Sequence, residues 1–172
     1  MTQRLPEPWM RGAVDGVAPL LQPVAHSLIF VREELQRALP PLTVEQLWAR
    51  PSGAASIGFH VRHLIGSLDR LLTYARGEAL SPEQLRALKV ESEPGEPPAE
   101  ATALLAEAEA ALERSMAQVR ATSVEALLQP RGVGRQQLPS TVIGLLFHAA
   151  EHAQRHVGQL VTTARVLSSD PR

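Results

Sequence analysis

The sequence predicts an all-α protein, a four-helix bundle within a single domain. Apolar residues recur at helical rather than alternating spacing along the 172 residues. Aromatic residues are few (2 Trp, 3 Phe and 1 Tyr), so the apolar surface is mostly Leu, Ala and Val, which favours helix-on-helix packing. Four long helices with two longer connections are typical of a bundle. We expect it to cover residues 19–167, with residues 1–15 and 168–172 peripheral.

The first predicted helix covers residues 19–39 and carries an apolar stripe along one face. The members of the stripe are Leu20, Val24, Leu28, Val31 and Leu35. Pro23 is tolerated in the first turn, where a missing N–H costs least, and Pro40 with Pro41 ends the helix. The residues from Thr43 to Gln46 then match a capping box, which predicts a short helical turn.

The second predicted helix begins after Ser56, a suitable N-cap, and ends near Arg76, with Gly77 in the position that favours a left-handed residue. Ser81 followed by proline marks the start of a further short helix. Residues 91–98 are acidic, rich in proline and without periodicity. They are predicted to form a surface loop.

The third predicted helix covers residues 99–120 and the fourth covers residues 140–167, about 40 Å at 1.5 Å per residue. Between them, two glycines within residues 130–134 predict a tight turn. Gly144 and Gly158 lie inside the fourth helix, where each costs about 1 kcal/mol relative to Ala. We therefore expect a neighbouring helix to approach closely at both glycines.

Composition excludes several classes of function. The formal net charge of −1 argues against a nucleic-acid partner, which requires a basic face. The absence of cysteine excludes disulfides, thiolate metal sites, iron–sulfur clusters and a cysteine nucleophile. No apolar run approaches 18 residues, and the N-terminus lacks the apolar segment of a signal peptide. We expect a cytoplasmic protein with no membrane association.

Five of the six histidines lie in two short windows, residues 60–63 and 148–156. Residues four apart on a helix have Cβ atoms about 5–6 Å apart, and two imidazoles at that spacing can bind one metal ion. On the fourth helix the spacing occurs twice, at His148, His152 and His156. Because the outer two lie about 12 Å apart along the axis, all three cannot bind one ion. The spacing leaves open which adjacent pair binds.

A catalytic site generally uses three protein ligands and keeps one position open. The second helix offers His60 and His63, three residues apart on one face. A carboxylate ligand is less expected, because Asp69 lies a turn and a half further along that helix. Since burying several imidazoles without partners is costly, the clustering favours a metal site between the two helices.

Other interpretations of the same residues remain open. His148, Glu151 and His152 match the inverted zinc-protease pattern H-x-x-E-H, but only 20 residues follow for the further acidic ligand that such enzymes need. A non-catalytic protein could hold a closed site, with His60 or His148 as fourth ligand. A histidine cluster without metal could respond to pH.

Two segments of the chain resemble the DinB-like superfamily of small bacterial metalloproteins. Around the second helix, LTVEQLW (residues 42–48) and SIGFHVRHLI (residues 56–65) resemble the first ligand region of that family. Near the C-terminus, HAQRHVGQL (residues 152–160) is similar to its H-x-x-x-H-x-G-Q signature. Val157 departs from the family pattern, in which Arg is common before the Gly-Gln pair. The resemblance extends from about residue 19 to residue 167.

The resemblance implies an up-down-down-up four-helix bundle, with short extra helical turns in its connections, that holds one zinc or nickel ion. The implied ligands are His63, His152 and His156. The implied neighbours of the site are His60, His148 and Glu151. Some relatives are thiol S-transferases or isomerases that use low-molecular-weight thiols, and others are suspected hydrolases. The resemblance thus implies a metal-dependent enzyme that acts on a small molecule. Because relatives often pair and long helices with Leu-rich faces commonly pack against a second copy, we also expect a homodimer.

Overall fold

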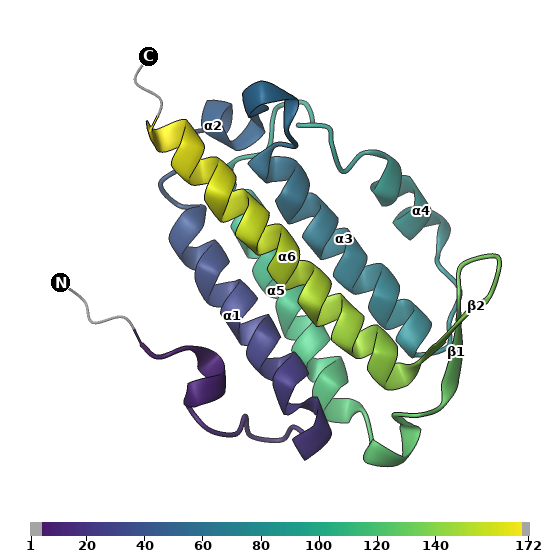
Figure 1. The fold of residues 1–172 in the computed structure, drawn as a ribbon. Coiled ribbons are helices and arrows are strands. Elements are labelled where there is room, and N and C mark those ends of the chain that lie inside the picture. Colours follow the sequence, from purple (N-terminus) through teal and green to yellow (C-terminus); the bar gives the residue numbers. More distant parts are fainter. Residues whose placement is uncertain (1–4, 170–172) are drawn as a thin grey trace.

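The computed structural model describes residues 5–169 and is mostly helical. Four long helices lie side by side, α1 (Gln22–Ala38), α3 (Ile57–Ala75), α5 (Ala101–Ala121) and α6 (Val142–Ser169) (Figure 1). Both α5 and α6 pack against α1 and α3. This arrangement places α6 beside α3, the two helices on which the five clustered histidines lie.

The shared core of the four helices is aliphatic, as the sequence predicts. Of the predicted stripe on α1, the side chains of Val24, Leu28, Val31 and Leu35 are buried. Leu20 is the exception, with 59% of its surface exposed, because residues 19–21 form a 3-10 turn that buries Leu21 instead. Among the described helices, none is long and apolar enough to cross a membrane.

Local capping signals set the starts of the shorter elements. In α2 (Val44–Trp48) the predicted capping box at Thr43 is present, and in α4 (Pro82–Lys89) the predicted N-cap Ser81 forms a capping box as well. Ser56 caps α3 by accepting a hydrogen bond from the backbone N–H three residues on, at 3.1 Å. The remaining helical turns are 3-10 turns at Pro8–Met10, Pro19–Leu21, Pro51–Gly53 and Val124–Ala126.

A β-hairpin, which the all-α prediction did not contain, precedes α6. Strands β1 (Pro130–Val133) and β2 (Leu138–Thr141) pair antiparallel, with Pro130 opposite Thr141. The sequence predicted only a tight turn here, because four-residue strands are too short for an alternating pattern. The second strand also delays the start of α6 from the predicted Ser140 to Val142.

The prediction of a close helix approach is wrong at both glycines of α6, Gly144 and Gly158. A Cβ added at Gly158 would meet no atom within 4 Å. At Gly144 the nearest atoms, at 3.1 Å, belong to Ser140 and Thr141, which precede the helix. Neither glycine is therefore explained by a neighbouring helix, and the glycine that is crowded lies on α3, as described below.

Candidate metal centre

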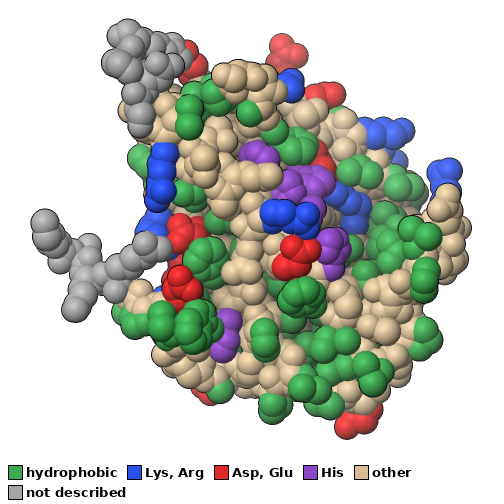
Figure 2. Space-filling view, in the orientation of Figure 1, with side chains coloured by type: hydrophobic (Ala, Val, Ile, Leu, Met, Phe, Trp, Pro, Cys, Tyr) green, Lys and Arg blue, Asp and Glu red, His purple; other side chains and the backbone are tan. Residues whose placement is uncertain are grey.

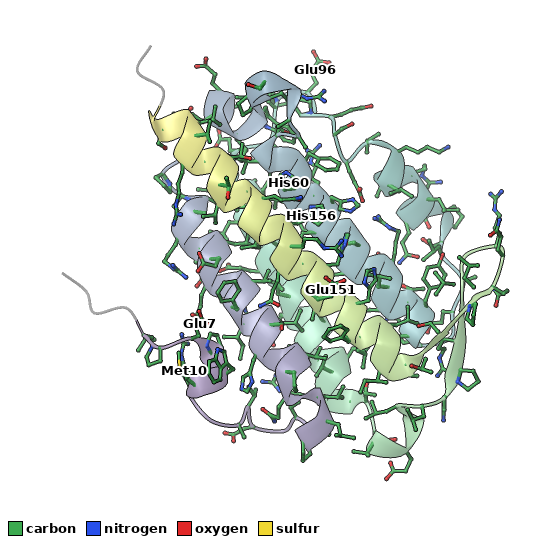
Figure 3. All side chains as sticks on the ribbon, in the orientation of Figure 1. Glu7, Met10, His60, Glu96, Glu151 and His156 are labelled. Atoms are coloured by element: carbon green, nitrogen blue, oxygen red, sulfur yellow. The ribbon has the colours of Figure 1, made fainter. Side chains whose placement is uncertain are left out.

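The histidines of α3 and α6 face one another where these two helices pack together. The labelled side chains His60 and His156 point from the two helices into the space between them, and Glu151 lies nearer the start of α6 (Figure 3). On α3, His60 and His63 are three residues apart and lie on the side that contacts α6. The interface thus carries imidazoles from both sides.

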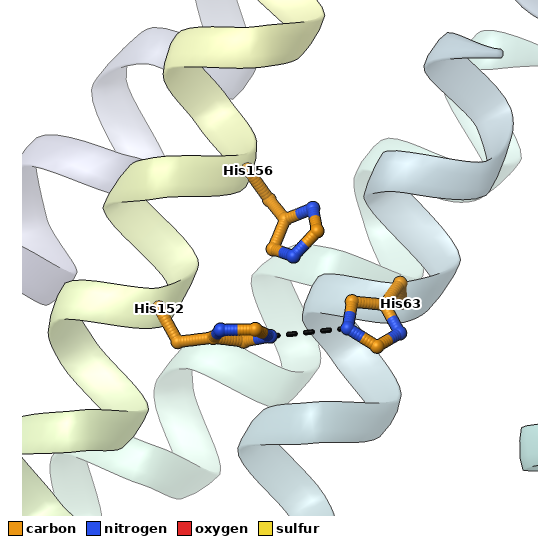
Figure 4. A group of neighbouring side chains, drawn as sticks. All are labelled: His63, His152 and His156. Carbon is orange, nitrogen blue, oxygen red and sulfur yellow. Dashed lines mark hydrogen bonds between the residues drawn. The ribbon is translucent and has the colours of Figure 1, made fainter. Parts of the chain in front are cut away.

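Three of these histidines bring one ring nitrogen each within 4.8 Å of the others: His63, His152 and His156. The Nε2 atoms of His63 and His152 are 3.0 Å apart (Figure 4). The ring of His156 lies 4.6 Å, between centroids, from each of the other two rings. Two nitrogens on one tetrahedral zinc ion would be about 3.3 Å apart, so this donor set fits a divalent transition metal.

His60 is buried and does not join the three clustered ring nitrogens, but it contacts one of the three histidines. It has 7% of its surface exposed, and its Nδ1 atom lies 2.9 Å from Nδ1 of His156. This hydrogen bond leaves Nε2 of His156 as the nitrogen not engaged by His60. Phe59 completes the packing, since its ring stacks on His63 with 5.4 Å between centroids. The two rings restrain the orientation of the candidate ligands.

His148 lies beside the cluster without joining it. Its Nδ1 atom is 2.7 Å from Glu151 Oε1, and Arg155 donates to both oxygens of that carboxylate at 2.9 and 3.1 Å. The side chains of His148 and Glu151 are 48% and 34% exposed. Of the two pairs that the spacing left open, the structure brings His152 and His156 together with His63.

Glu91 contacts the cluster, and the sequence did not indicate it. Its Oε2 atom accepts a hydrogen bond from Nδ1 of His63 at 2.7 Å, and its Oε1 atom accepts one from Arg70 Nη1 at 2.6 Å. Glu91 is only 6% exposed, so the predicted surface loop is wrong at its first residue. One signal was present: Arg70 lies two turns after His63 on the same side of α3.

The environment keeps the imidazoles in the form that binds metal. Burial, followed by the charges of the neighbouring histidines and of Arg155, lowers the pKa of His156 to about 3. Burial is also the first cause of the lowered pKa of His60 and of His152. Near neutral pH these rings are therefore neutral, and a neutral imidazole is the ligand form of histidine.

The cluster is accessible at the surface. Figure 2 shows histidine side chains gathered on the face that α6 and α3 share, with basic and acidic side chains next to them. The side chain of His63 is 22% exposed, and the guanidinium of Arg155 lies 3.2 Å from Nδ1 of His152. All three histidines are thus partly exposed, and Arg155 lies beside them as a cationic group.

Comparison with models of known protein families gives a match. The family model of the DinB superfamily matches residues 27–160, which is more than half of the chain and contains all three clustered histidines. No curated protein matches the chain.

Proposed function

The chain belongs to the DinB superfamily, and we propose that it is a metal-dependent enzyme with one zinc or nickel ion at His63, His152 and His156. The observation that carries the proposal is the convergence of three ring nitrogens from two helices within 4.8 Å. Three histidine ligands are typical of catalytic zinc sites, in which a further position is left for water or substrate.

The proposed chemistry is thiol S-transfer or hydrolysis on a small molecule. A divalent ion bound by three histidines supplies Lewis acidity that lowers the pKa of water or of a substrate thiol toward neutrality. Because an imidazole binds a metal ion in its neutral form, three histidine ligands would leave the charge of the ion uncompensated, which favours an anionic nucleophile. Arg155 beside His152 adds a cationic group for an anionic part of the substrate. With no cysteine in the sequence, a reacting thiol would come from the substrate.

We also propose the up-down-down-up helix order. In Figure 1 α1 and α6 run in one direction, and α3 and α5 run in the other. Two neighbouring helices with the same direction need a connection that returns along the bundle, and residues 76–100 supply one that includes α4. The support for this order is thus the long connection between α3 and α5.

The metal site is tested by metal content. Protein expressed with added Zn²⁺ or Ni²⁺ is expected to contain about one ion per chain, measured by elemental analysis. The variant His152→Ala is expected to lose it, because two imidazoles form a weaker site. His148→Ala is the matched control, being an exposed histidine one turn away that is expected to keep the ion. Full occupancy in His152→Ala would contradict the ligand assignment.

Activity is tested on chelator-treated protein with Zn²⁺ or Ni²⁺ restored. Turnover of thiol conjugates indicates a transferase, and turnover of simple esters indicates a hydrolase. The alternative is a non-catalytic, metal-stabilised protein, in which His60 or His148 completes a closed site. That alternative predicts four protein ligands, which the absorption spectrum of the Co²⁺-substituted His60→Ala and His148→Ala variants would reveal by a change of coordination.

A further inference from the structure

A buried polar cluster lies on the side of His63 that faces away from α6. It joins Glu91 to His63 and to Arg70, and the side chains of the two charged residues are 7% and 11% exposed. An ionised carboxylate accepts hydrogen bonds and cannot donate them. Nδ1 of His63 therefore carries the hydrogen in the bond to Glu91, and Nε2, which faces His152, keeps its lone pair.

A glycine on α3 makes room for this cluster. A Cβ at Gly66 would lie 2.3 Å from Oε1 of Glu91 and 2.6 Å from Nη1 of Arg70. Glycine within a helix is unfavourable, and a close approach is the usual reason to find it there. The sequence suggested a close approach at two glycines of α6. The structure shows one at Gly66 of α3 instead, where the missing side chain leaves space for the ion pair of Glu91 and Arg70.

The connection that supplies Glu91 is held to α3 at further points. Arg62 donates to the backbone carbonyls of Glu93 and of Pro94. The guanidinium of Arg62 lies 4.9 Å from the centre of the Trp48 ring, and the indole N–H of Trp48 donates to the carbonyl of Ala99 at 2.9 Å. These contacts fix the course of residues 93–99, so the carboxylate reaches His63 from a restrained backbone.

We propose that Glu91 is the positioning residue of the metal centre: it holds His63 in the tautomer whose Nε2 is free to bind the ion. Arg70 and Gly66 hold the carboxylate in place. The inference rests on the metal site proposed above. It extends that site to a segment, residues 90–99, that follows α4 and contributes no metal ligand.

The decisive variant is Glu91→Gln, which keeps the shape of the side chain and one acceptor. The amide oxygen is expected to accept from the charged guanidinium of Arg70, which turns the amide N–H groups toward Nδ1 of His63. That ring nitrogen must then accept, so the hydrogen moves to Nε2, where the ion should bind. The matched control is Glu151→Gln, because Glu151 also contacts one histidine and one arginine but is exposed.

Zinc affinity, measured by competition with a chromogenic chelator, gives the first readout. We expect Glu91→Gln to bind Zn²⁺ about 10- to 100-fold more weakly than wild type, and Glu151→Gln to stay within about fivefold. Equal affinities of Glu91→Gln and wild type would overturn the inference while leaving the metal site intact. Absence of Zn²⁺ and Ni²⁺ binding in wild type would instead overturn the proposed function.

The tautomer gives a readout that a merely structural role would not move. Long-range ¹H–¹⁵N NMR of the metal-free protein is expected to show His63 with its hydrogen on Nδ1 in wild type and on Nε2 in Glu91→Gln. An unchanged tautomer in a folded Glu91→Gln protein would contradict the inference.

A second pair of variants tests the same contact without altering any charge. Gly66→Ala would displace the flexible ends of Glu91 and Arg70, so we expect a loss of zinc affinity of about tenfold with the fold retained. Gly158→Ala, at an open position on α6, is expected to bind zinc as wild type does. Equal zinc affinities in the two alanine variants would count against a role of the carboxylate's position.

Discussion

Two clusters at the candidate metal site each contain one Glu, one His and one Arg, and only one of the two clusters is buried. Glu91 lies between His63 and Arg70, and Glu151 lies between His148 and Arg155. The Glu91 side chain is 7% exposed and comes from a distant connection, whereas the Glu151 side chain is 34% exposed and its partners lie about one turn away on α6. The same three residue types thus occur as a tertiary contact and as a local surface contact.

The difference shows that burial decides what such a cluster does. At the surface, water and salt compete with the ion pair, which leaves it worth about 0–1 kcal/mol. In the interior, each charged group depends on its partner, and removal of one partner leaves an uncompensated charge. The buried cluster can therefore orient His63, whereas the exposed cluster leaves His148 free to exchange its hydrogen bond with water.

The largest expected effect is on stability and separates the two arginines. Arg70→Leu leaves the buried carboxylate of Glu91 without its counter-charge, and we expect a loss of about 3 kcal/mol or more in the free energy of unfolding. Arg155→Leu is expected to cost less than about 1 kcal/mol. Urea denaturation of both variants measures the difference, and equal losses would show that burial does not distinguish the clusters.

The second prediction concerns the pH dependence of the buried imidazoles. In the folded protein the pKa of His156 is lowered from 6.5 to about 3. Between these two values the unfolded chain binds more protons than the folded one, so the free energy of unfolding falls as the pH falls. We expect metal-free protein to lose stability from about pH 6.5 toward pH 3, and His156→Gln to lose less. Denaturation curves at several pH values, with chelator present, test this slope; identical slopes would contradict it.

A smaller effect is expected at the two contrasting glycines. Gly158→Ala removes a helical glycine where a Cβ meets no atom within 4 Å, so we expect a gain of about 0.5–1 kcal/mol in the free energy of unfolding. Gly66→Ala should show no such gain, because its Cβ would collide with the buried ion pair. Thermal unfolding of both variants provides the comparison, and a stabilised Gly66→Ala protein would argue that the cluster tolerates displacement.

The smallest effect is on the exposed cluster itself. A double-mutant cycle on Glu151 and Arg155, which are four residues apart on α6, is expected to give a coupling of about 0.3–0.5 kcal/mol at low salt. In 1 M NaCl, where the screening length is about 3 Å, the coupling should approach zero. A coupling unchanged by salt would mean that Glu151 is shielded from solvent, contrary to its exposure.

The features that the sequence could predict depend on interactions between residues close together in the chain. Capping at Ser56 and Ser81 depends on residues three positions apart, and the spacing of His152 and His156 depends on one helical turn, so these features are visible in the chain itself. The choice of His63 over His60 needed the family resemblance, because both lie on the same side of α3 and only tertiary packing separates their roles.

The features that were not predicted are contacts between distant segments. Glu91 is 28 residues from His63, and no local spacing connects a residue of a proline-rich segment with a helix of the core. The contact of His60 with His156 spans 96 residues and likewise depends on how α3 and α6 pack. The role of Gly66 could not be predicted from the sequence, because it depends on the side chains of Glu91 and Arg70 that occupy the space beside it.

The most direct test of the metal centre is a crystal structure of metal-loaded protein with anomalous diffraction at the absorption edge of the bound metal. We predict a single anomalous peak at about 2.0–2.1 Å from one ring nitrogen of each of His63, His152 and His156, with no fourth protein ligand. A peak at another place in the molecule, or one bonded to His60 or His148 as a fourth ligand, would contradict the proposed site.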